Sequence, residues 1–268
     1  MWTPTLAELD PRWFLVVVMA SLTYGVMSPV VKARRFLFLA GALPHSALLS
    51  ALLAIVLERT LNFPFELGSI LLSLLLVSIV SLLISKGISP DSATAIFVSF
   101  TVSMTTIVLY YILTAFPMET SVWALIIGDP LLVSWSDVRF GFIITVAVVL
   151  SLLPFLREQI LLGVDRDFVR LSGIRPEFYD AMLVVAMALS TVGLLKVVGF
   201  VVEHVMILLP GVTAAMFAKS GRQAVVASIL ISVLGGLAGL ALSLATGLAP
   251  SGVIGLVLLA IYLVVSRR

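Results

Sequence analysis

The stretch FYDAMLVVAMALSTVGLLKVVGFVVEHVMILLPGVTAAMFA, residues 178–218, decides the fold class. Asp180, Lys196 and Glu203 are its only formally charged side chains, so it has no polar face to turn to water. A helix needs about 20 apolar residues to cross a bilayer. The stretch is therefore long enough for two crossings, with a turn marked by Lys196 and Gly199. A single span followed by a re-entrant piece is the alternative.

The composition of the whole chain agrees with a membrane protein. Of its 268 residues, 61% are hydrophobic and 11% are charged, against roughly 45–50% and about 25% in soluble domains. Backbone groups in lipid must be hydrogen-bonded internally, which permits helices or closed barrels. The apolar runs are continuous over about 18–25 residues, the length of a helical span rather than of a barrel strand. We expect an all-α transmembrane helical bundle forming one domain over residues 1–268.

Nine spans are predicted, and eight to ten would fit the pattern. They cover Trp13–Val31, Phe36–Leu57, Leu67–Ser85, Ser92–Ala115, Phe140–Phe155, Phe178–Leu195, Gly199–Ala218, Val225–Thr246 and Ser251–Val265.

Basic residues predict the orientation of these spans, because loops on the cytoplasmic side are rich in Lys and Arg. When the first loop, with Lys32, Arg34 and Arg35, is placed inside, alternation puts twelve of the sixteen basic residues inside. We therefore expect a multi-pass protein of the cell membrane with a cytoplasmic C-terminus. The formal charge is only +2, which predicts no nucleic-acid partner. The absence of cysteine excludes disulfides and thiolate metal sites.

Two loops are too long and too polar to be simple connections. Residues 116–139 contain Glu119, Trp123, Asp129 and Trp135. They form either an interfacial segment anchored by tryptophan or a docking surface at the outer mouth.

The second loop, residues 157–177, is the most charged stretch of the chain. Asp165 is placed to cap a short helix there and Gly173 to end it. The segment is either a plain interfacial helix or a contact for a cytoplasmic motor subunit.

Small residues recur at every fourth position of the eighth span, at Gly235, Gly239, Ser243 and Gly247. Such a stripe lets helices approach closely. We expect it to serve packing within the chain rather than dimerisation.

Four stretches resemble the permease subunit of ABC transporters that import zinc or manganese, the ABC-3 type. They are DRDFVRLSGI at 165–174, KVVG at 196–199 followed by LLPGVTA at 208–214, PSG at 250–252 and GALPHSA at 41–47. Their order and spacing carry the resemblance.

This resemblance implies a fold like that of type II ABC importers, in a homodimer with a pore between two copies. It also implies ABC ATPase subunits on the cytoplasmic face and an extracytoplasmic metal-binding protein. The 157–177 loop would couple to the ATPase through Asp165, Asp167, Arg170, Ser172 and Gly173. The chain contains no phosphate loop of the form GxxxxGK[ST]. We therefore expect a partner subunit to bind ATP, and no enzyme activity or cofactor in this chain.

Both histidines, His45 and His204, fall inside predicted spans, where ionisable groups are costly and tend to be functional. Neutral imidazole is a common ligand of transition metals. The alternative is a buried hydrogen bond between helices. The resemblance favours the ligand interpretation of His45, although Gly41 stands where the family usually has an aspartate.

Glu203 and His204 are adjacent, so on a regular helix they point about 100° apart. Glu203 needs protonation or a partner at this depth, and Lys196 or a bound cation could serve. Pro210 removes one backbone hydrogen bond and is expected to distort the helix, with Gly235 and Gly239 as further packing or gating positions. We hypothesise that His45, Glu203 and His204 transiently coordinate Zn²⁺ or Mn²⁺.

Three other functions fit parts of the pattern. The first is an ABC permease for an iron chelate or corrinoid, although such permeases are usually longer. The second is an ion-coupled secondary carrier in which Glu203 takes up protons. The third is an intramembrane enzyme using Glu203 and His204, which lacks the second histidine of an HExxH helix.

Overall fold

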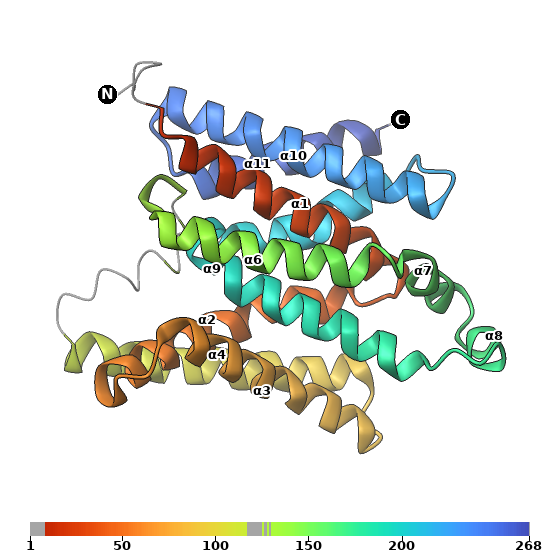
Figure 1. Cartoon of the computed structure of the whole chain (residues 1–268), viewed down its shortest axis with the longest axis horizontal. Coiled ribbons are helices and arrows are strands. Elements are labelled where there is room, and N and C mark those ends of the chain that lie inside the picture. The colour runs from red at the N-terminus through yellow and green to blue at the C-terminus, as the bar shows by residue number, and fades with distance from the viewer. Residues whose placement is uncertain (1–8, 117–124, 126–127, 129, 268) are drawn as a thin grey trace.

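The computed structural model describes residues 9–116, 125, 128 and 130–267, and the regular elements among these residues are helices (Figure 1). They are α1 (Pro11–Ala33), α2 (Leu37–Leu61), α3 (Phe65–Ser85), α4 (Pro90–Ala115), the short 3₁₀ helix η2 (Pro130–Leu132), α6 (Trp135–Leu152), α7 (Leu156–Val164), α8 (Arg166–Leu171), α9 (Pro176–Ala214), α10 (Gly221–Thr246) and α11 (Pro250–Ser266). This confirms the all-α prediction.

Within the described ranges, seven helices are long and apolar enough to cross a membrane. One of them, α9, has 39 residues and is interrupted at Gly199, whose φ of 75° and ψ of 158° are not helical. The predicted sixth and seventh spans are the two halves of α9. The last helix, α11, is apolar but has 17 residues. Each of the nine predicted segments therefore corresponds to a helix or half of one, although α6 ends at Leu152 and α9 at Ala214, before the predicted ends Phe155 and Ala218.

Three helices form the centre of the bundle. Between 67 and 78% of the apolar stretches of α1, α2 and α9 is buried, against 22–39% for α3, α4, α6 and α10. In Figure 1, α3 and α4 lie beside α2 on one side of α9, and α10 and α11 lie beside α1 on the other. The outer helices expose large apolar side chains, including Leu75, Ile107 and Leu234, which suits contact with lipid rather than water.

The basic segments predicted to share one side of the membrane meet at one end of the bundle (Figure 1). Arg34, after α1, bonds to Gln159 of α7 and Asp180 of α9. The first residue of α10, Gly221, packs against Ile160 of α7. Two pockets bring further segments together. Pro90, which starts α4, and Arg166, which starts α8, line one of them. Phe217, after the end of α9, and Ser266, the last residue of α11, line the other. The assignment of this end to the cytoplasm stays a prediction.

The described part of the 116–139 loop lies at the opposite end. The Trp13 indole donates to the Leu131 carbonyl at 3.1 Å, and a capping box of Ser134 and Asp137 starts α6. Trp135 is exposed, as expected of an interfacial anchor. Glu119, Trp123 and Asp129 lie outside the described residues.

The small-residue stripe of α10 faces α11. A Cβ atom on Gly235 would lie 2.5 Å from Leu258, and one on Gly239 would lie 2.6 Å from the Ile254 backbone. Both glycines therefore allow a close helix approach within this chain. A gating role for them stays a prediction.

Candidate metal pathway and coupling segment

The break in α9 is fixed by two glycines from distant parts of the chain. Gly199 has a backbone conformation that is essentially restricted to glycine. Gly128 packs directly on it, since a Cβ on Gly128 would lie 2.2 Å from the Gly199 Cα. The loop backbone therefore sits against the point where the second half of α9 begins. The first turns of that half carry Phe200, Glu203 and His204.

The two histidines that the sequence suggested as metal ligands, His45 and His204, lie close together near this break. The ring centroids of His45, on α2, and His204, on α9, are 5.3 Å apart. Phe200 packs edge-on against both rings, at 5.0 Å from His45 and 4.7 Å from His204. Both imidazoles are half-buried. One turn before His45, a Cβ on Gly41 would contact only the Leu208 side chain, at 3.8 Å, so this position has room for a larger side chain.

A hydrogen bond orients the His204 ring. Its Nδ1 lies 2.8 Å from the Phe200 carbonyl oxygen. Because a carbonyl can only accept, Nδ1 carries the proton, and in the neutral ring Nε2 then holds a lone pair. This is the arrangement by which a backbone carbonyl orients a metal-ligating histidine.

Glu203 faces a different neighbour. It is fully buried, and its Oε1 accepts a hydrogen bond from the Tyr24 hydroxyl of α1 at 2.9 Å. That hydroxyl also lies 3.2 Å from the Ser190 carbonyl oxygen. Glu203 Oε2 has no hydrogen-bond partner in the described part of the chain. Tyr24 was missed by sequence reasoning, because an aromatic residue in an apolar span is indistinguishable from ordinary core.

Lys196 is not the partner of Glu203. Its ammonium lies 3.8 Å from Asp137 Oδ1 and 4.3 Å from the centroid of the Phe65 ring. The non-helical Gly199 between the two residues removes the continuous helix that would have placed them on one face.

The predicted three-ligand set is therefore divided. His45 and His204 lie together, whereas Glu203 points to α1, as expected of adjacent residues about 100° apart. Among the described residues, no group of three or more His, Cys, Asp or Glu side chains could hold a metal ion. The arrangement offers two imidazoles from one chain.

Pro210 lies where α9 crosses α1. The Ser28 hydroxyl donates to the Leu208 carbonyl at 3.2 Å and accepts from the Gly211 amide at 2.8 Å. A serine of α1 thus satisfies backbone groups beside the proline of α9, which is how membrane helices tolerate such residues. A Cβ on Gly211 would lie 2.4 Å from the Ser28 backbone, so the two helices touch there.

The charged 157–177 segment folds as two short helices, α7 and α8. The Asp165 side chain accepts from the Phe168 amide at 2.9 Å and caps α8, as predicted. Gly173 follows the helix with a φ of 81°, a turn conformation that glycine adopts without strain. The Ser172 hydroxyl bonds to the Phe168 carbonyl, and Arg170 pairs with Glu177 at 2.5 Å. Asp167 is exposed.

A polar cluster joins this segment to the central helices, and we call it the Arg34 cluster: Arg34, Gln159, Arg166 and Asp180. Arg34 donates to Gln159 Oε1 at 2.6 Å and to Asp180 Oδ1, while Arg166 donates to Asp180 Oδ2 at 2.5 Å. Burial, with repulsion from Arg166, lowers the pKa of Arg34 to about 10, so its guanidinium stays charged at neutral pH. Sequence reasoning used Arg34 only as an orientation signal and missed this role.

A bundle of seven helices long and apolar enough to cross a membrane, within the described ranges, defines the class of multi-pass membrane proteins. The chain belongs to the ABC 3 transport family, which matches residues 8–268. It is a membrane permease subunit of this ABC transporter family and not itself an enzyme.

Relatives of the chain carry names from two metal systems. The zinc uptake membrane protein ZnuB of Buchnera aphidicola is 26% identical over 87% of each chain. The manganese import permease ScaB of Streptococcus gordonii is 22% identical over 87% of this chain and 83% of its own. In structure, PsaBC from Streptococcus pneumoniae matches with a TM-score of 0.84 and 20% identity, over 97% of this chain and 92% of that one. The fold is therefore shared.

Proposed function

We propose that this chain is the permease subunit of an ATP-driven importer for a divalent metal ion, Zn²⁺ or Mn²⁺. The observation that carries the proposal is the His45–His204 pair, two imidazoles 5.3 Å apart at the break of α9. Within a membrane bundle, such groups mark substrate pathways. The names of the zinc and manganese relatives support the same class of cargo.

The donor set favours zinc over manganese. Imidazole nitrogen suits Zn²⁺, whereas Mn²⁺ prefers carboxylate and carbonyl oxygen. His204 offers Nε2 with a lone pair because Nδ1 is bonded to Phe200. Two protein ligands bind less tightly than the four of a structural zinc site, and weak binding lets a transported ion leave. Water completes the coordination shell.

Movement of the ion requires partners. We propose a homodimer, two ABC ATPase subunits at the end that carries α7 and α8, and a binding protein delivering metal at the opposite end. The apolar side chains of Phe168 and Leu171 on α8 are 61 and 88% exposed, which fits a surface covered by another subunit. Through the Arg34 cluster, movement of α8 would reach α1 and α9.

Uptake of radioactive zinc into proteoliposomes containing the permease, ATPase and binding protein tests the proposal. We expect His45→Ala and His204→Ala each to lower uptake by about 100-fold or more. Losing a group that only orients a metal ligand already costs about 10–100-fold. Ser50→Ala is the matched control, because Ser50 is buried on the same helix and bonds only to the local Ala47 carbonyl among described residues.

Two outcomes would contradict this function. Undiminished uptake by both histidine variants would remove the imidazole pair from the pathway. If the purified chain takes up zinc without the ATPase, and a Glu203 variant loses that uptake, the chain is instead an ion-coupled secondary carrier.

A further inference from the structure

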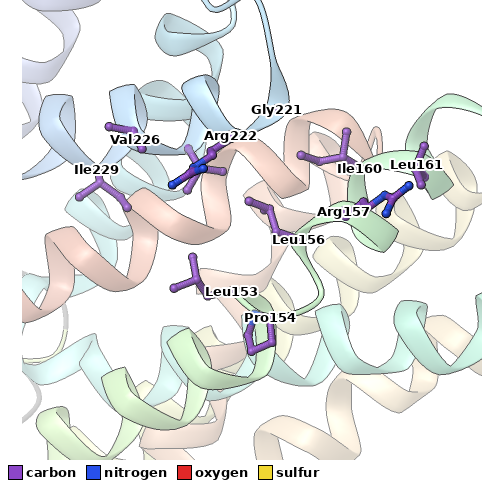
Figure 2. A pocket seen from close by; sticks show the side chains of 11 residues that line it. Leu153, Pro154, Leu156, Arg157, Ile160, Leu161, Gly221, Arg222, Val226 and Ile229 are labelled. Carbon is purple, nitrogen blue, oxygen red and sulfur yellow. The ribbon is translucent and has the colours of Figure 1, made fainter.

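A groove away from the histidine pair separates α10 from the end of α6 and from α7. Its volume is about 660 Å³. Figure 2 shows Leu153, Pro154 and Leu156 on one side and Val226 and Ile229 of α10 on the other. Gly221 closes one end, since a Cβ there would lie 2.3 Å from Ile160. The remaining lining residues are Arg157, Leu161, Arg222 and Val225.

Among the described residues, two arginines are the charged residues that line the groove, one from each wall. Arg157 is the second residue of α7, and Arg222 is the second residue of α10 (Figure 2). Both are exposed, and neither forms an ion pair within the described part of the chain. Glu158, the neighbour of Arg157, does not line the groove. Among the described residues, the lining of the groove is therefore cationic, and the first turn of α7 carries Glu158 outside that lining.

The positions of these arginines add to the effect. The first turn of a helix carries a partial positive charge, which disfavours a cation and favours an anion. At α7, the N-cap residue Phe155 provides no side-chain hydrogen bond. At α10, the Ser220 hydroxyl satisfies the Gln223 amide, and the first turn contains no acidic residue. Two helix starts and two arginines thus line one groove; in Figure 2 the guanidiniums point apart, and because both side chains are exposed they can turn toward a shared anion.

We infer that this groove binds one anionic phospholipid, with its phosphate between Arg157 and Arg222 and an acyl chain along α10. Basic pockets between membrane helices near the bilayer surface bind such headgroups. From Gly221 to Ile229, α10 supplies a wall about 12 Å long. Val226 is 52% and Leu153 47% exposed, which leaves apolar surface for a chain that a free phosphate would not cover.

The bound lipid would connect α7 to α10 across the groove. Apart from such a lipid, α7 and α10 contact each other through Ile160 and Gly221. The site would therefore hold α7, which starts the coupling segment, against the bundle. This inference requires only that the helices lie in a bilayer, and it stands whether or not the chain carries metal.

The test uses the full chain purified in neutral detergent and native mass spectrometry with added phosphatidylglycerol or phosphatidylcholine of identical acyl chains. We expect tighter binding of phosphatidylglycerol. A basic residue near anionic lipid contributes about 1 kcal/mol, or about fivefold in affinity. Arg157→Gln and Arg222→Gln should each lose about that factor, whereas Arg267→Gln, exposed and outside the groove, should lose none.

Equal binding of both lipids, or unchanged binding by both groove variants, would overturn the inference. So would inorganic phosphate that displaces phosphatidylglycerol at equal concentration, because the groove would then be a plain anion site. Val226→Cys provides a separate check, since the chain has no other cysteine. Labelling of Val226→Cys by a lipid-soluble maleimide, blocked by phosphatidylglycerol, supports the site. A disulfide between two copies in the membrane would show a protein interface instead.

Discussion

Two polar sites among the described residues, the Arg34 cluster and the surroundings of Glu203, differ in how completely their groups are bonded. In the Arg34 cluster, Asp180 accepts from two arginines with its two oxygens, and Gln159 both accepts from Arg34 and donates to the Tyr179 carbonyl. At the centre of the bundle, Glu203 uses one oxygen for Tyr24 and leaves the other without a partner among the described residues. Beside it, His204 keeps Nε2 available.

This difference separates a structural role from a transport role. A buried charge is tolerated when partners satisfy it, and a saturated cluster has no bonding capacity left for a ligand. Polar groups left incomplete cost stability, and Glu203 Oε2 is one of several such atoms among the described residues. The comparison therefore assigns a structural role to the Arg34 cluster and agrees with the proposal that the His45–His204 pair exchanges its ligand.

The largest effect is expected from Arg34→Met. This change removes a side chain that is 2% exposed and leaves Gln159 and Asp180 without their shared donor. Asp180 keeps its bond to Arg166 and is 24% exposed, so the cost should lie below the about 3–5 kcal/mol lost when a fully buried charge is left without a partner. Thermal unfolding in detergent should therefore shift down by several degrees. Arg267→Met, an exposed basic residue at the same end, is the control. An unchanged unfolding temperature for Arg34→Met would show that the cluster is not structural.

A smaller effect is expected from Tyr24→Phe. The variant leaves both Glu203 oxygens unbonded within a fully buried site, and such a group costs about 1–3 kcal/mol. Replacing both partners should be nearly neutral, so Tyr24→Phe combined with Glu203→Met should recover most of the loss. The same unfolding assay measures both. If the double variant is no more stable than the single one, Tyr24 is not what satisfies Glu203.

Much of the helical framework could be predicted from the sequence, because long apolar runs have one stable form in lipid. The break in α9 was marked by Gly199 itself. The sequence also placed His45 and His204 in spans, but their distance depends on how α2 packs on α9. The partner of Glu203 lies 179 positions away, whereas local spacing pointed to Lys196. Arg34 served only as an orientation signal in the first loop, because a single sequence does not show that it bonds to Gln159 of α7.

The smallest effect on stability is expected from Leu171→Asp. The same variant should have a large effect on assembly with the ATPase. Leu171 is 88% exposed at the end of α8, and substitutions at such positions usually change the free energy of unfolding by less than about 0.5 kcal/mol. If α8 docks on the ATPase as proposed, a carboxylate there would be buried in an apolar contact, where an unpaired charge is costly. Co-purification of the permease with its ATPase should therefore fall while the unfolding temperature stays constant. Leu132→Asp is a matched control, since Leu132 is 74% exposed in η2, at the end of the bundle where α1 and α6 begin. If both variants retain the ATPase equally, α8 is not the docking surface, and the Arg34 cluster supports a segment with another task.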